Sequence, residues 1–325
     1  MKRRKRRAPL PTTCGCTGSP DDRVYLLDRK SLWVYRKTLK HICGQFMKRS
    51  LLALIVLGGL FNSQPRADET QPQLRPKPEG TLRLKLRTRV ETFKGSGEWD
   101  EINLAKSVPV SEVAIIICDM WDKHWCEGAT ERCGALAEKM APVLNAARAK
   151  GVQVIHAPSD TMNFYQATRQ RRRVLLAPRV DLPKPLDLSD PPLPIDDSDG
   201  GCDTPQKPWY KAWTREIAKI DIGEFDGISD NGEEVYLFLK QLGVKYLIVM
   251  GVHTNMCVLN RTFAIRQMTR RGIQCILARD LTDTMYNPKM RPFVTHDQGT
   301  ELVIEHIEKY WCPSVLSSDL VAGLP

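Results

Sequence analysis

Apolar and polar residues follow two different spacings along this chain, and each spacing predicts one type of element. From Leu82 to Glu91 leucines alternate with Arg and Lys, which is typical of a strand with one solvated face. The continuous apolar runs at 113–118 and 246–252 predict strands that are buried on both faces. Further strands are predicted at 152–156, 217–222, 274–278 and 314–317.

Apolar residues spaced by three and four positions predict the helices between these strands. The clearest helix covers 134–150, where Leu136, Met140 and Leu144 share one face and Gly151 ends the pattern. Other helices are predicted at 163–177, 233–242, 257–271 and 300–310. Strands that alternate with helices indicate an α/β domain whose parallel sheet is covered on both faces.

The N-terminal part of the chain differs from the rest. Residues 1–46 are basic and without a fold pattern, so they are either a leader or the result of a start placed before Met47. Residues 47–67 combine a short basic stretch, an apolar run of 11 residues and a polar end, as a signal peptide does. That run is shorter than the roughly 20 residues of a membrane span. We therefore expect a secreted or periplasmic protein with no membrane attachment after cleavage.

The remaining segments are a linker with an N-terminal strand at 68–110 and one α/β domain at 111–325. Inside that domain, residues 178–209 hold eight Pro and seven Asp. Such a long irregular stretch is typical of a functional loop or an insert.

Net charge argues against a nucleic-acid partner. The chain carries +10, but residues 1–50 hold 14 Lys or Arg against three Asp. The other 275 residues therefore sum to −1. The α/β domain has no excess of positive charge with which to bind nucleic acid.

Seven cysteines follow residue 67, and an odd number leaves at least one thiol free. Cys126, Cys133, Cys202 and Cys312 lie in loop-like or terminal stretches and are candidates for disulfides in an oxidising compartment, with the connectivity open.

Polar residues mark the ends of three predicted strands: Asp119 follows the first, His156 is the last residue of the second, and His253 to Cys257 follow the strand at 246–252. Ligands of parallel α/β sheets bind at this edge. A thiol at a helix N-terminus faces unpaired N–H groups, which favour thiolate and can bind an oxyanion. Asp119 could accept the thiol proton; the alternative is a buried structural cysteine.

Two motifs carry a resemblance to a known family. Asp119-Met120 with Trp125, and Gly251-Val-His-Thr-Asn-Met-Cys257-Val, resemble the isochorismatase-like cysteine hydrolases, which include nicotinamidases. The resemblance covers 113–317, and the sequence around Trp125 is similar to that of a secreted bacterial subgroup. It implies a three-layer α/β/α fold with a six-stranded, mainly parallel sheet.

The resemblance also implies roles for individual residues. Cys257 would be the nucleophile and Asp119 its base. A cis peptide between Val252 and His253 would direct the backbone N–H groups of His253 and Cys257 at the substrate oxygen.

A lysine completes the site in this family, and here the chain departs from the pattern. Alignment without gaps places Glu224 at that position, while Lys219 lies five residues earlier. A glutamate would raise the pKa of Asp119 by repulsion instead of stabilising its charge.

The predicted substrate pocket combines residues that follow the strands: Trp121, Trp125, His156, Asn255 and Tyr286. No cofactor is required by this chemistry. A divalent metal held by His156 and Asp160 is an alternative, because some members of the family place metal ligands there.

The leading hypothesis is a secreted cysteine hydrolase that cleaves a C–N bond of a small amide through a thioester. Two alternatives stay open. One is a vinyl-ether hydrolase that uses Asp119 without the cysteine, as isochorismatases do. The other is a binding protein that has lost catalysis with the lysine. In each case the partner is a small molecule, and homo-oligomers are common in the family.

Overall fold

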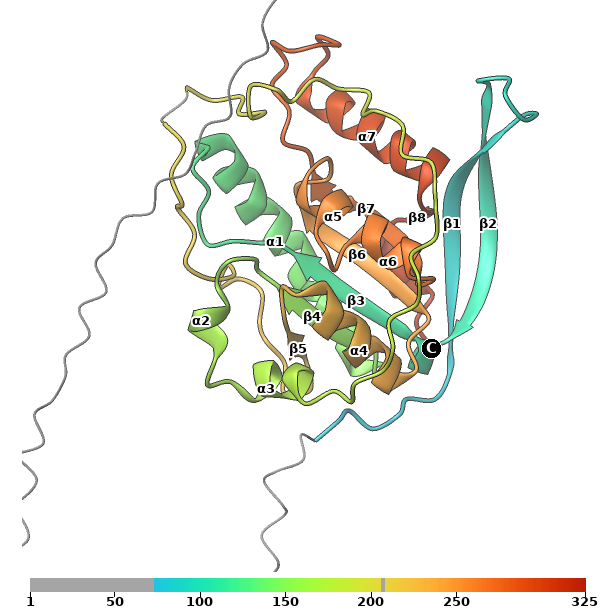
Figure 1. Ribbon diagram of the computed structural model, residues 1–325, viewed down its shortest axis with the longest axis vertical. Coiled ribbons are helices and arrows are strands. Elements are labelled where there is room, and N and C mark those ends of the chain that lie inside the picture. Colours follow the sequence, from blue (N-terminus) through green and yellow to red (C-terminus); the bar gives the residue numbers. More distant parts are fainter. Residues whose placement is uncertain (1–72, 206–207) are drawn as a thin grey trace, which may run out of the picture. The chain divides into compact units, whose positions relative to one another are not determined.

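A computed structural model describes residues 73–205 and 208–325 (Figure 1). The predicted leader at 1–46 and signal peptide at 47–67 lie outside the described residues. One eight-stranded sheet crosses the domain in the order β2-β1-β8-β7-β6-β3-β4-β5. The prediction of a mainly parallel α/β sheet is confirmed, with eight strands in place of six.

Four strands form the parallel centre of the sheet. They are β3 (Val113–Cys118), β4 (Gln153–Ala157), β6 (Tyr246–Val252) and β7 (Gln274–Asp283). β3 pairs with β6 on one side and with β4 on the other, in parallel. Every residue of β3 is buried, as its unbroken apolar sequence predicts.

Helices cover both faces of the sheet, which gives the predicted three layers. Successive residues of β3 point to opposite faces, so Ile116 joins one hydrophobic cluster and Ile115 the other. The first cluster includes α4 (Gly232–Leu242), α5 (Cys257–Asn260), α6 (Ile265–Arg270) and α7 (His296–Tyr310). The second includes α1 (Glu127–Ala149) and α8 (Ser317–Ala322).

The two additional strands come from an N-terminal hairpin. β1 (Thr81–Glu91), which was predicted, pairs antiparallel with β2 (Trp99–Pro109), which was not. β2 is exposed along most of its length, so it lacks the apolar alternation that marks a half-buried strand. The short β8 (Ser314–Val315) joins β1 to β7.

Three local predictions need correction. The strand predicted at 217–222 is wrong, and the strand beside β4 is β5 (Gly227–Ile228). The helix predicted at 163–177 is divided into α2 (Met162–Tyr165) and α3 (Arg169–Leu175). The helix predicted at 257–271 is divided into α5 and α6, because Arg261 adopts an extended ψ of 150°.

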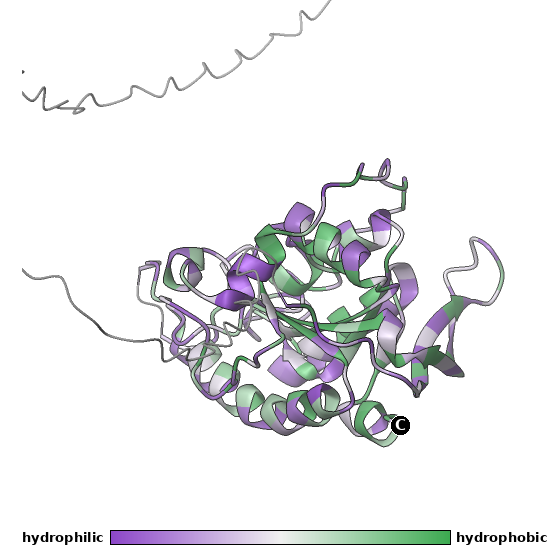
Figure 2. Cartoon of the chain, turned by 90° about the horizontal axis from the view of Figure 1, so that it is seen from below, coloured by the Kyte–Doolittle hydropathy of each residue, from purple (hydrophilic) through white to green (hydrophobic). Residues whose placement is uncertain are grey.

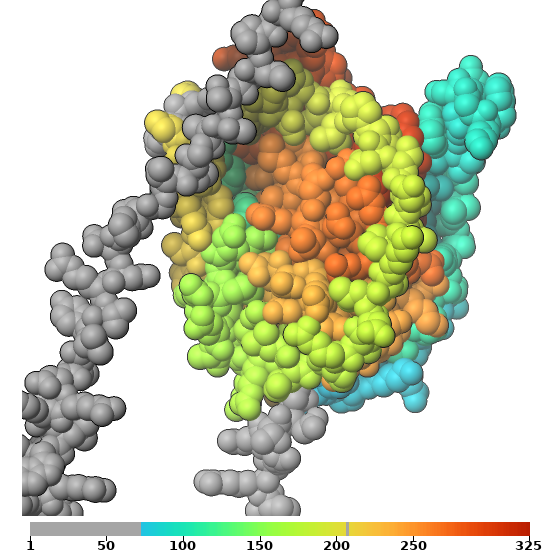
Figure 3. All heavy atoms as spheres, in the orientation of Figure 1, coloured from blue at the N-terminus to red at the C-terminus, as the bar shows by residue number. Residues whose placement is uncertain are grey.

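The predicted insert contains no helix or strand in its described part, and it runs across the helices of the first face (Figure 3). It is held there by specific contacts: the Leu186 N–H donates to the Arg270 carbonyl, and Asp190 forms an ion pair with Arg266 at 2.6 Å. Within 73–205 and 208–325, no helix is both long and apolar enough to cross a membrane.

Candidate functional site

Cys257 and Asp119 come together because their strands are neighbours. Asp119 follows β3, and Cys257 begins α5 just after β6. Gly251 permits this approach: its φ is +117°, and a Cβ there would lie 2.0 Å from the Cys118 carbonyl oxygen. The predicted juxtaposition at the carboxyl edge of the sheet is therefore present in the structure.

The Asp119 carboxylate is fully buried and held at both oxygens. Oδ1 accepts the Ser159 backbone N–H at 2.7 Å, and Oδ2 accepts Arg261 Nε–H at 2.9 Å. The Cys257 thiol lies beside this carboxylate and interacts with it. Burial raises the pKa of Asp119, while Arg261 and these hydrogen bonds act in the opposite direction.

The pKa of the Cys257 thiol differs from the prediction made from its position at a helix N-terminus. Burial first, and then the charge of Asp119, raise its pKa well above the ordinary value. The helix N-terminus thus does not produce a thiolate here. Burial and the Asp119 charge both favour a proton on the sulfur, beside a carboxylate that can accept it.

The peptide bond between Val252 and His253 is cis, as the resemblance implied. The His253 N–H points at the Cys257 sulfur. In the part of the chain that the structure describes, neither this N–H nor the Cys257 N–H donates to an oxygen atom. The two groups are thus available to a substrate oxygen beside the thiol.

The predicted third residue of the site is in neither expected place. Lys219 is exposed and contacts Glu138 on α1, and Glu224 is exposed in a turn. The cation beside Asp119 is Arg261, which the sequence reasoning missed. A signal was available, because Arg261 follows Cys257 by four residues and such residues share a helix face.

The predicted pocket residues separate into two groups. Trp121 is buried, donates to the Ser159 carbonyl and stacks on Trp213 with ring centroids 4.3 Å apart. A void of about 10 Å³, about the size of one water molecule, lies between Trp121, His124, Asp119 and His253. Burial lowers the pKa of His253 to about 3, so this imidazole is neutral.

The other predicted pocket residues have structural contacts. The Asn255 amide binds Asp197 of the insert, and the buried Tyr286 donates to the Met290 carbonyl. Trp125 packs against the cluster of Cys126, Cys202 and Met285.

His156 is fully buried between two carboxylates, Glu216 at 2.6 Å and Asp226 at 2.9 Å. Burial opposes its charge, but the two carboxylates outweigh burial and raise the pKa of His156 to about 9. Both ring nitrogens are engaged, and Asp160 lies instead 4.0 Å from Arg261. The structure therefore does not bring His156 and Asp160 together as a pair of metal ligands.

One disulfide joins Cys126, at the N-terminus of α1, to Cys202 of the insert. Asp203 lies beside these two sulfurs in the one group of potential metal ligands found among the described residues. Because the sulfurs are bonded to each other, they offer no thiolate to a metal. The other two disulfide candidates, Cys133 and Cys312, are buried thiols.

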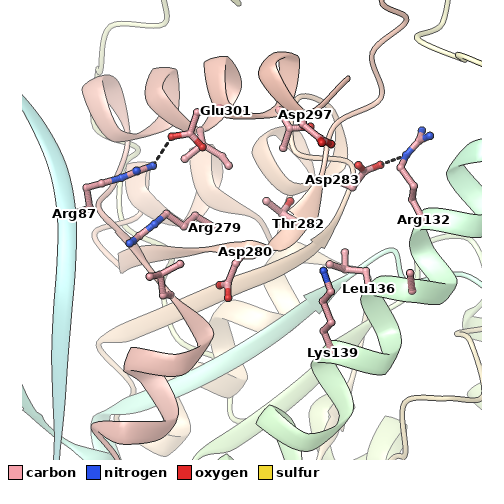
Figure 4. Close-up of a pocket in the computed structure, with 14 residues that line it drawn as sticks. Arg87, Arg132, Leu136, Lys139, Arg279, Asp280, Thr282, Asp283, Asp297 and Glu301 are labelled. Carbon is pink, nitrogen blue, oxygen red and sulfur yellow. Dashed lines mark hydrogen bonds and ion pairs between the residues drawn. The ribbon is translucent and has the colours of Figure 1, made fainter. Parts of the chain in front are cut away.

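A separate cavity of about 440 Å³ lies between α1, β7 and α7 (Figure 4). Its lining contains neither Cys257 nor Asp119. Arg132 pairs with Asp283 at 3.0 Å, and Arg87 pairs with Glu301 at 2.7 Å, so much of its charge is already neutralised. We therefore place the candidate site at Cys257.

Comparison with known proteins identifies the family of the domain. The isochorismatase domain family matches residues 113–294, more than half of the chain. A search of curated proteins finds no match.

Several solved structures are similar in fold. A cysteine hydrolase from Pseudomonas syringae pv. phaseolicola 1448A is 18% identical, with a TM-score of 0.44. The match covers 67% of this chain and 94% of the chain of that hydrolase. An isochorismatase family protein from Burkholderia thailandensis is 15% identical, with a TM-score of 0.39, covering 66% and 96%.

The domain match spans β3 and β6, the strands that precede Asp119 and Cys257. The chain belongs to the isochorismatase domain family, and this membership supports a hydrolase.

Proposed function

We propose that this protein hydrolyses a C–N bond of a small amide through a thioester on Cys257. One observation carries the proposal: the Cys257 thiol lies beside a buried carboxylate, Asp119, which also accepts hydrogen bonds from Arg261 and the Ser159 N–H. This supplies a nucleophile, a base and a cation that keeps the base ionised. No cofactor enters the reaction.

In the first half-reaction, the Cys257 sulfur attacks the amide carbonyl carbon while Asp119 takes the thiol proton. The negative charge that develops on the carbonyl oxygen is stabilised by the N–H groups of His253 and Cys257. The C–N bond breaks as Asp119 gives its proton to the leaving nitrogen. The products of this half are an amine or ammonia and an acyl-Cys257 thioester.

In the second half-reaction, a water molecule attacks the thioester carbonyl and Asp119 removes its proton. The C–S bond then breaks, the sulfur recovers that proton, and a carboxylic acid leaves. Asp119 must therefore be ionised before each attack. Because burial raises its pKa, the partner Arg261 is needed to keep it ionised near neutral pH.

The test measures ammonia or amine release from a panel of small amides, with Cys257→Ala and Cys257→Ser as a matched pair. We expect a loss of at least about a thousandfold in kcat for Cys257→Ala. Intact-mass spectrometry of the wild type, quenched during turnover, should find an acyl adduct that both variants lack.

Two outcomes would refute this mechanism. Full turnover in Cys257→Ala would favour vinyl-ether hydrolysis by Asp119 alone. Saturable ligand binding with neither turnover nor an acyl adduct would instead favour a binding protein.

We also propose that the protein acts outside the cytoplasm, in the periplasm or after secretion. The Cys126–Cys202 disulfide supports this, because such bonds persist in oxidising compartments. Fractionation of producing cells, followed by N-terminal sequencing, tests it. Recovery of the intact chain in the cytoplasm with both thiols reduced would contradict the proposal.

A further inference from the structure

The outer edge of β2 is a free strand edge. β2 is the terminal strand of the sheet, and among the described elements none lies beyond it in either view (Figures 1 and 2). Its backbone groups on that side therefore have no partner strand in this part of the chain.

The hydrogen-bond register shows which residues face outward. Beyond the two ends of the β1–β2 ladder, Thr92 N–H donates to the Glu98 carbonyl and Val110 N–H to that of Gly80. Hydrogen-bonded pairs therefore fall at even positions of the hairpin, and the register between β1 and β2 is unbroken. The odd positions of β2, including Asn103, direct their N–H and C=O groups outward.

This edge lacks two of the features that usually prevent strand addition, a bulge and a proline in the middle of the strand. β2 is 11 residues long and free of bulges, and its one proline, Pro109, is its last residue. Ile102 and Leu104 are 36% and 47% exposed in its middle. The charged residues of β2, Asp100, Glu101 and Lys106, flank this apolar pair and do not interrupt it.

We propose that β2 pairs antiparallel with β2 of a second copy of this chain, about a two-fold axis at Asn103. Odd residues then form the hydrogen-bonded pairs of the new ladder. Even residues form the non-hydrogen-bonded pairs, in which side chains approach most closely. Ile102 lies opposite Leu104 of the other copy, and Asp100 lies opposite Lys106, each pair occurring twice.

The charges of Asp100 and Lys106 support a second copy of this chain as the pairing partner of β2, and they favour this register. Asp100 has no ion-pair partner within residues 73–205 and 208–325. Lys106 contacts only neutral groups there, the Gln274 amide oxygen at 2.8 Å and the Tyr246 ring at 4.6 Å. If one copy of β2 slid by two residues along the other, Asp100 would lie opposite Leu104 or Val108 instead of Lys106. That pairing is less favourable.

The dimer does not depend on the proposed hydrolysis. β1, β8 and β7 separate β2 from the strands that carry Cys257 and Asp119. Variants of β2 should therefore alter assembly and leave turnover unchanged.

Sedimentation velocity of the processed protein tests the proposal. We expect a dimer for the wild type and a monomer for Asn103→Pro, which removes an outward N–H but no bond to β1. Asp100→Lys replaces two attractions by repulsions and should weaken the dimer about tenfold or more. The double variant Asp100→Lys/Lys106→Asp restores the complementarity and should restore the dimer.

Lys94→Asp, in the hairpin loop, is a charge-reversal control outside the proposed ladder and should remain dimeric. Circular dichroism and thermal unfolding establish that each variant is folded. A monomeric wild type at high concentration overturns the proposal, as does a dimer that persists in folded Asn103→Pro. Failure of the double variant to recover the dimer overturns the proposed register.

Discussion

Arg261 donates through Nε to Asp119 at 2.9 Å, in the position where the family resemblance led us to expect a lysine. An arginine can hold this carboxylate in place of a lysine because its charge is retained at every working pH. The chain has therefore kept a cation at the site although the usual strand position carries Glu224. This relationship weakens the argument for a binding protein that lost catalysis with its lysine.

Removal of the Arg261 charge should impair the base. In Arg261→Gln the pKa of Asp119 rises further, because the cation that opposes the effect of burial is gone. We expect kcat/KM to fall about 10²–10³-fold at neutral pH and its acidic limb to move to higher pH. Arg261→Lys, which retains the charge, should recover part of the activity. Equal profiles for the wild type and Arg261→Gln would exclude this role.

Asp119→Asn should make Cys257 more reactive while it abolishes hydrolysis. The negative charge of Asp119 is one cause of the raised thiol pKa, so its removal lowers that pKa. We expect iodoacetamide to alkylate Cys257 faster in Asp119→Asn at neutral pH, and the rate of the wild type to increase only at alkaline pH. Cys257→Ala identifies background labelling. Slower alkylation in Asp119→Asn would contradict the proposed proton arrangement.

The buried His156 imidazolium should make the fold sensitive to alkaline pH. Its pKa rises from 6.5 to about 9 on folding, so its contribution is complete below about pH 6.5 and is lost as the pH rises through 9. At about 1.4 kcal/mol per pH unit, the free energy of unfolding should fall by roughly 3 kcal/mol across this range. Denaturant titrations of the wild type and His156→Gln measure it.

In His156→Gln that pH dependence should be reduced, and the protein should be less stable at pH 6 because Glu216 and Asp226 lose their shared partner. Parallel stability curves for the two proteins between pH 6.5 and 9 would show that His156 is not the titrating group.

Loss of the Cys126–Cys202 disulfide should destabilise the fold. The two cysteines are 76 residues apart in sequence, so the bond restricts a long segment of the unfolded chain. We expect Cys126→Ser/Cys202→Ser to lower the free energy of unfolding by about 2–4 kcal/mol. A reductant should lower the thermal midpoint of the wild type and leave that of the double variant unchanged, and non-reducing peptide mapping should recover the linked pair.

The sequence alone predicted the parts of the fold that depend on local patterns. Unbroken apolar runs located β3 and β6, and the spacing in 134–150 located most of α1, because burial on two faces or on one stripe leaves a direct trace in sequence. The opposite case is β2, which was missed since a mostly exposed strand has no such pattern. The strand predicted at 217–222 failed because local sequence alone does not show whether a segment reaches the sheet.

The candidate site divides in the same way. The sequence located Cys257, Asp119 and the turn between β6 and α5. These residues belong to a short motif or directly follow a predicted strand. Only the tertiary structure decided which cation meets Asp119, that His156 lies between two carboxylates, and that Cys126 bonds to Cys202. These depend on contacts between segments up to 142 residues apart in the chain, whose distances follow from packing and not from local sequence.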